Sequence, residues 1–214
     1  MKPRWLMLVI SLLMVTGCTI TKVDDNNIDG IINTILNNKT EVTNTYSLGY
    51  QYYLPRNVKV SSISDYNEML YTNNINYYLY VDVISYYHKV NISYNEYKKA
   101  YYSKMLEFND KKGYIEINKI NDKYFIEMMF NYAKIESYVN KDYLSQAIID
   151  GCYILSNLTY NEKIIKNLID NDDFDKGAEQ FNIFKPKREE GKYLDYIKEY
   201  DKYEDINNQL PDYE

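Results

Sequence analysis

Apolar residues recur along the chain with two different periods, and each period predicts a type of element. Near the N-terminus, five aliphatic residues recur every three or four positions: Ile28, Ile31, Ile32, Ile35 and Leu36. This spacing places them on one face of an α-helix. The pattern predicts a helix over residues 26–37, with Asp24 or Asp25 at its N-terminal cap.

Between residues 46 and 139, apolar residues alternate with polar ones or form short unbroken runs, which is typical of strands. We expect strands over 46–54, 58–63, 68–71, 75–90, 101–108, 113–120 and 124–139. The two longest segments are apolar on both faces, which predicts central strands. On one strand over 124–139, Glu127 and Glu136 are an odd number of residues apart and would point to opposite faces.

Helical periodicity returns after residue 140. The segment 141–157 carries a stripe of apolar and small residues that includes Gly151 and Cys152, and it predicts the principal helix. Gly151 within this helix costs about 1 kcal/mol relative to alanine, which is tolerable if the glycine permits close packing on the sheet. A second helix is predicted over 161–169. From about residue 187, acidic and basic residues dilute the apolar content, which predicts a charged C-terminal tail.

This order of elements predicts an α+β fold, with a single antiparallel sheet packed against N- and C-terminal helices. The organisation we expect is a leader over 1–17, a tether over 18–25, one domain over 26–186 and a tail over 187–214.

The first residues have the features of an export leader. Lys2 and Arg4 precede an apolar run of ten residues from Leu6 to Val15, interrupted only by Ser11. The run is too short to span about 30 Å of hydrocarbon as a permanent helix, and it fits the apolar region of a signal peptide.

The run ends in Val15-Thr16-Gly17-Cys18. This sequence resembles the lipobox of bacterial lipoproteins, although Val15 replaces the preferred leucine. The resemblance implies cleavage after Gly17, a diacylglycerol on the Cys18 sulfur, and a location on the outer face of the plasma membrane. Two acyl chains on one cysteine hold a protein far better than one chain. An ordinary cleaved signal peptide and an uncleaved anchor helix remain open as alternatives.

The mature domain has a second resemblance, which rests on the order of its elements over residues 40–170. It is similar to the PsbP/Mog-type α/β sandwich, in which a long C-terminal helix closes a small sheet. That group includes binding and assembly factors without catalytic activity, so the resemblance implies a binding role more than an enzymatic one.

Charge narrows the range of partners. The formal net charge is −6, and loss of Lys2 and Arg4 with the leader leaves 23 basic against 31 acidic residues. Such a chain lacks the basic face that nucleic acids require, and it has no polybasic patch for anionic lipids. We therefore expect the lipid on Cys18, rather than surface charge, to hold the protein at the membrane.

Tyrosine is unusually abundant, with 27 residues. Asn, Ile and Lys are abundant too, and all four have A/T-rich codons, so drift in a low-GC genome explains the excess. The alternative is an aromatic surface for glycans or proteins. Even spreading over buried and exposed positions would favour drift, whereas one exposed patch would favour a binding face.

Candidate chemistry is sparse. His88 is the only histidine, and Cys152 is the only cysteine besides Cys18, so triads and most zinc sites are disfavoured. We expect Cys152 to be a buried apolar residue. The acidic segment 170–177 departs from a calcium loop, because Lys176 stands in place of the turn glycine. A polar-aromatic pocket is the one site we predict on the domain: Tyr80, Asp82, Tyr86 and His88.

These observations favour a non-catalytic binding module of the cell envelope, with no cofactor or metal. Its expected partners are the membrane, through Cys18, and an envelope protein or wall polymer. The alternative is a hydrolase of wall or lipid material that uses Asp82, Glu127 or Glu136. A transporter's solute-binding component is a third possibility, but the chain is short for a two-lobed clamp.

Overall fold

A computed structural model describes residues 27–37, 42–64, 66–72, 74–171 and 185–187. The predicted leader, lipobox and tether, Cys18 itself, and nearly all of the predicted tail and of the acidic segment 170–177 lie outside the described residues. No described helix is both long enough and apolar enough to cross a membrane.

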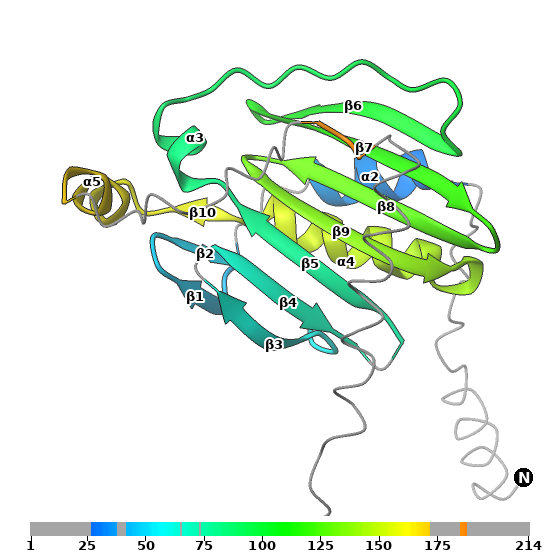
Figure 1. Cartoon of the computed structure of the whole chain (residues 1–214), viewed down its shortest axis with the longest axis horizontal. Coiled ribbons are helices and arrows are strands. Elements are labelled where there is room, and N and C mark those ends of the chain that lie inside the picture. Colours follow the sequence, from blue (N-terminus) through cyan, green and yellow to red (C-terminus); the bar gives the residue numbers. More distant parts are fainter. Residues whose placement is uncertain (1–26, 38–41, 65, 73, 172–184, 188–214) are drawn as a thin grey trace, which may run out of the picture.

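The fold is α+β, as predicted, and its main layer is an antiparallel sheet of seven strands in the order β3-β4-β5-β9-β8-β7-β6 (Figure 1). The strands are β3 (Lys59–Ser64), β4 (Asn67–Tyr71), β5 (Asn76–Val81), β6 (Tyr102–Phe108), β7 (Lys111–Ile120), β8 (Lys123–Phe130) and β9 (Ala133–Asn140). The chain forms one meander from β3 to β5 and a second from β6 to β9, and pairing of β5 with β9 joins them.

Two helices cover one face of this sheet and contact each other there, α2 (Ile28–Leu36) and α4 (Leu144–Ser156) (Figure 1). Both were predicted. The α2 cap is Asn27, whose side chain accepts a hydrogen bond from the Gly30 amide. A short 3₁₀ turn, η1 (Lys141–Tyr143), precedes α4. A Cβ added at Gly151 would lie 2.0 Å from the Met128 Cε atom, so this glycine does permit close approach of α4 to the sheet.

The prediction of a single sheet was wrong. A second sheet of three strands contains β1 (Thr45–Ser47), β2 (Tyr50–Tyr52) and β10 (Thr159–Tyr160). The expected strand over 46–54 is in fact a hairpin, because Gly49 adopts a positive φ of 87° and reverses the chain. Helix α5 (Glu162–Asp170) follows β10, as predicted, and its Ile165 packs beneath Gly49.

The expected long strand over 124–139 is also two strands. Asn131 and Tyr132 adopt left-handed φ angles of 53° and 60° and form a tight turn between β8 and β9. A non-glycine residue rarely adopts this conformation unless it is Asn or Asp. Because Tyr132 is a bulky aromatic residue, the sequence pattern does not indicate a turn here. This turn determines where Glu127 and Glu136 lie.

Candidate functional site

The four residues of the predicted polar-aromatic pocket lie on two elements: Tyr80 on strand β5, and the other three within or at the ends of helix α3 (Val83–Tyr87). The strand expected over 75–90 ends at Val81, where Asp82 caps this short helix. Its two carboxylate oxygens accept hydrogen bonds from the Ser85 amide and the Ser85 hydroxyl, each at 2.7 Å. His88 follows at the exposed C-terminal end of α3. Asp82 and His88 are therefore the cap residues at the two ends of α3, and neither lies on a strand.

Tyr86 lies in a cluster of aromatic rings that joins α3 to β10. Its ring stacks on Tyr160 at 3.8 Å between centroids and meets the Tyr132 ring edge to face at 5.8 Å. Its hydroxyl donates to Glu162, which begins α5, at 3.2 Å. Tyr80 lies on β5, packed beside the buried Tyr114–Met129 cluster. The packing of Tyr86 thus connects elements of the fold.

Three buried glutamates form a row across the face of the large sheet opposite α4. The β7–β8 register pairs Glu116 with Glu127, and the β8–β9 register pairs Glu127 with Glu136. All three are buried. The prediction that Glu127 and Glu136 point to opposite faces was therefore wrong, because the turn at Asn131 and Tyr132 folds them into direct cross-strand opposition.

Lys134 neutralises the centre of this row. Its Nζ atom lies 2.7 Å from a Glu127 oxygen and 2.8 Å from a Glu136 oxygen, and its side chain is buried. Burial disfavours the Lys134 ammonium, but the two carboxylates outweigh this effect and raise the pKa of Lys134. Burial raises the pKa of Glu127, and Lys134 opposes that shift.

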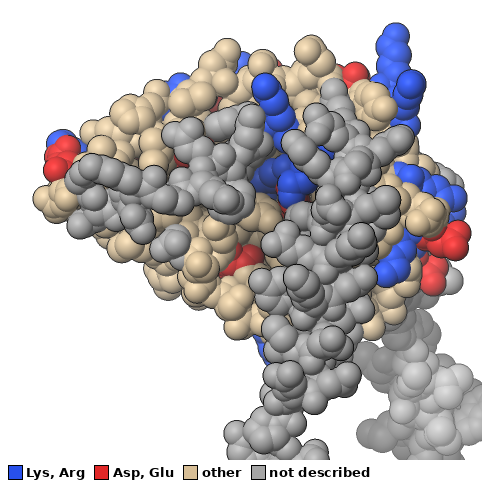
Figure 2. All heavy atoms as spheres, in the orientation of Figure 1, with Lys and Arg blue, Asp and Glu red and all other residues tan. Residues whose placement is uncertain are grey.

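Lys187 completes the network from a distant part of the chain. Its backbone N–H donates to both Glu127 oxygens, at 3.0 Å each, and its Nζ atom donates to Glu136 at 2.6 Å. The segment 185–187 therefore lies on the face of the sheet opposite the helices (Figure 1). Lysine or arginine atoms reach the surface near the middle of that face (Figure 2). Lys187, the expected first residue of a tail outside the core, is thus bound to the sheet.

We expect Lys187→Met to lower the free energy of unfolding by about 1–2 kcal/mol, because Glu136 loses a charged donor whose side chain is 44% exposed. Denaturant unfolding followed by circular dichroism measures the change. Lys185→Met is the matched control, because Lys185 is exposed and makes none of these bonds. Equal stability of the two variants would contradict an anchoring role for Lys187.

Cys152 and the pair Glu127 and Glu136 are candidates for nucleophilic or acid–base chemistry among the described side chains. The fold engages all three. Cys152 is a buried apolar residue, as predicted, with its sulfur 3.9 Å from the Met128 sulfur. Burial raises the pKa of its thiol to about 12, which disfavours the reactive thiolate. Glu127 and Glu136 are bound by lysines. Within the described ranges, no three or more His, Cys, Asp or Glu side chains are arranged so that they could hold a metal ion.

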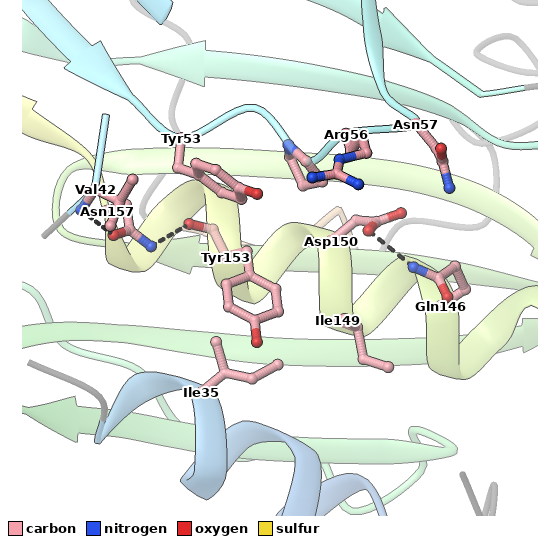
Figure 3. A pocket seen from close by; sticks show the side chains of 11 residues that line it. Ile35, Val42, Tyr53, Arg56, Asn57, Gln146, Ile149, Asp150, Tyr153 and Asn157 are labelled. Atoms are coloured by element: carbon pink, nitrogen blue, oxygen red, sulfur yellow. Dashed lines mark hydrogen bonds between the residues drawn. The ribbon is translucent and has the colours of Figure 1, made fainter. Parts of the chain in front are cut away.

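A pocket of about 520 Å³ lies on the helical side of the molecule, where α2, α4 and the loop after β2 meet (Figure 3). Helix α4 contributes Gln146, Asp150 and Tyr153 to its wall, and the loop contributes Tyr53 and Arg56. This pocket is not evident in the sequence, where Pro55-Arg56-Asn57 predicts only a turn. The side chains that line it meet only after α4 packs beside that loop.

The carboxylate in this pocket is already satisfied by the protein. Asp150 is buried, and its two oxygens accept hydrogen bonds from the Tyr77 hydroxyl at 2.6 Å and the Gln146 amide at 2.9 Å. Burial raises the pKa of Asp150, and the two hydrogen bonds oppose the shift. Asp150 therefore belongs to the structural wall of the pocket.

The described tyrosines are spread over buried, half-buried and exposed positions. Tyr52 is fully buried, whereas Tyr46 is 71% exposed. The exposed ones lie on separate elements: Tyr46, Tyr71, Tyr101 and Tyr153. Several hydroxyls donate to acidic side chains, as Tyr50 and Tyr52 do to the buried Glu68 at 2.6 and 2.5 Å. This distribution favours codon drift as the source of the tyrosine excess.

Comparison of the sequence with models of known protein families, and with well-characterised proteins, gave no match. The resemblances to bacterial lipoproteins and to the PsbP/Mog-type sandwich stay predictions from the sequence.

Proposed function

We propose that this chain is a lipid-anchored protein of the outer face of the bacterial plasma membrane, where its domain binds a wall polymer or another envelope component without catalysing a reaction. One observation carries the anchoring: Thr16-Gly17-Cys18 directly follows the ten-residue apolar run. Nine residues separate Cys18 from the start of α2 at Ile28. At full extension they reach about 30 Å, so the domain would stay close to the lipid surface.

The geometry of the domain supports binding over catalysis. The residues named for the hydrolase alternative are engaged within the fold, since Asp82 caps α3 and lysines bind Glu127 and Glu136. General acid–base catalysis needs such groups within reach of a substrate proton. The pocket beside α4, in contrast, is open to solvent and presents polar and aromatic side chains together. These features are typical of a ligand-binding site.

The anchor is tested by Cys18→Ser in cells labelled with radioactive palmitate. We expect the wild-type protein to be labelled and released from membranes only by detergent, and the variant to be unlabelled and soluble, because two acyl chains supply the membrane affinity. Cys152→Ala is the matched control and should keep the label. A Cys18→Ser protein that is still labelled, or unlabelled but still membrane-bound, would contradict the proposal.

A further inference from the structure

The pocket beside α4 contains hydrogen-bonding groups that no described residue engages. In the described part of the chain, the Arg56 guanidinium and the Asn57 carboxamide have no hydrogen-bond or ion-pair partner. Both residues are exposed and border the pocket. A guanidinium offers five donors in a planar fork that matches a carboxylate with two parallel hydrogen bonds. The Arg56 cation at this pocket therefore favours an anionic ligand.

Two tyrosines supply an apolar surface beside this cation. The rings of Tyr53 and Tyr153 meet edge to face, with 6.2 Å between centroids and 64° between planes. Tyr153 is 38% exposed although it lies on α4. Tyrosine provides rigid, amphipathic contact area at a low entropic cost. A ligand with a flat or ring-shaped body can pack against these rings while its polar groups meet Arg56 and Asn57.

The pocket also has a polarity that would orient such a ligand. Arg56 comes from the loop above α4, whereas Asp150 comes from the helix (Figure 3). Both Asp150 oxygens already accept hydrogen bonds from Tyr77 and Gln146. An anionic group is therefore attracted to Arg56 and repelled from Asp150, so its position in the pocket is fixed.

We propose that this pocket binds a carboxylated sugar, with Arg56 bound to the carboxylate and Tyr53 and Tyr153 packed against the sugar ring. The volume of about 520 Å³ lies within the range of pockets for small molecules. The inference rests on the proposed function, because it names the part of a wall polymer that the domain recognises. The pocket itself lies wholly in the folded domain, so ligand binding is measurable whether or not Cys18 carries lipid.

The test is a titration of the purified full-length chain in detergent micelles, followed by saturation-transfer NMR of the ligand. The probes are two acids, N-acetylmuramic acid and glucuronic acid, and the neutral N-acetylglucosamine. We expect the acids to bind at least tenfold more tightly than the neutral sugar. Arg56→Gln should remove this difference by weakening the acids at least tenfold, and Tyr153→Ala should weaken all three probes.

Lys59→Gln is the matched control, because Lys59 is an exposed cation on β3 outside the pocket, and it should change no affinity more than twofold. Cys18→Ser should bind the acids as the wild type does, so failure of the anchor and failure of the pocket are distinguishable. Circular dichroism verifies that each variant is folded. Absence of saturable binding of both acids, equal affinity for acids and neutral sugar, or binding that Arg56→Gln leaves unchanged would each overturn the proposal.

Discussion

Lys134→Met should lower the free energy of unfolding by about 3–5 kcal/mol at pH 7, the usual result of removing one partner from a buried ion pair. Lys134 is the buried cation between Glu127 and Glu136, at 2.7 and 2.8 Å. Without it, two buried carboxylates face each other across β8 and β9, and the Lys187 Nζ atom still donates to Glu136. Denaturant unfolding followed by circular dichroism measures the loss.

The deficit of this variant should depend on pH. Burial already raises the pKa of Glu127 in the folded protein, and removal of Lys134 removes the main opposing effect. The folded state then binds a proton at a pH where the unfolded glutamate, with a pKa of about 4.3, does not. Stability rises with falling pH wherever the folded state binds more protons. The deficit should therefore be largest near neutral pH and shrink as the pH is lowered toward 5.

Two further variants separate charge from packing. Glu127→Gln combined with Lys134→Met removes one of the two carboxylate charges, so it should recover part of the lost stability and flatten the pH dependence. Lys112→Met breaks an exposed ion pair with Glu107, 3.2 Å long, and should cost less than about 1 kcal/mol. A Lys134→Met protein as stable as the Lys112→Met protein would show that the buried network is not a charge-compensated unit.

The helices of this fold were predictable because helical periodicity is a local property of the sequence. The predicted segments 26–37, 141–157 and 161–169 correspond to α2, to η1 with α4, and to α5. Each has an apolar stripe at the spacing of one helix face. Their bounds differ from the predicted ones by at most two residues, because the caps depend on individual side chains, as at Asn27 and Asn161.

Strand boundaries were less predictable, because turns of left-handed residues interrupt continuous apolar runs. The segment 124–139 remains apolar through Asn131 and Tyr132, so the sequence pattern continues where the chain reverses. The same reversal sets the register, and one turn in the wrong place inverts which residues share a face. This error concealed the row formed by Glu116, Glu127 and Glu136.

The pocket beside α4 was not predictable from spacing, because its parts are distant in the sequence. Arg56 and Tyr153 are almost a hundred residues apart, and they become neighbours only when α4 packs on the sheet. The predicted polar-aromatic pocket was instead based on local alternation, which placed Tyr80 and His88 on the same face of one strand. The strand ends at Val81, so this alternation does not extend to His88. The short span between Asp82 and Ser85, typical of a helix N-cap, was the local feature that indicated this end.

The second large effect is expected at Gly113, the first residue of the strand expected over 113–120. Strands β6 and β7 form a hairpin whose turn residues are Asn109 and Asp110, with positive φ angles of 48° and 65°. Gly113 lies within β7, hydrogen-bonded between β6 and β8, where it pairs with Leu106 and Phe130. A glycine is therefore needed at this position because a side chain has no room there, and not because the backbone adopts an unusual conformation.

Gly113→Ala should lower the free energy of unfolding by about 3 kcal/mol, at the upper end of the usual cost of overpacking. A Cβ at this position would lie 1.9 Å from the Met129 carbonyl oxygen and 2.7 Å from the Phe130 Cα atom. Both atoms belong to the backbone of β8, a central strand, so relief of the clash requires the sheet itself to move. Denaturant unfolding measures the loss, together with a lowered melting temperature.

Gly151→Ala is the matched control, because its added Cβ is equally close to another atom but that atom can move. The nearest atom is the Met128 Cε, 2.0 Å away at the end of a flexible side chain. Alanine is also favoured over glycine within a helix by about 1 kcal/mol, which offsets the repacking of Met128. We therefore expect Gly151→Ala to be nearly neutral. If both alanines proved equally tolerated, the close approach of β7 and β8 at Gly113 would not constrain this sheet.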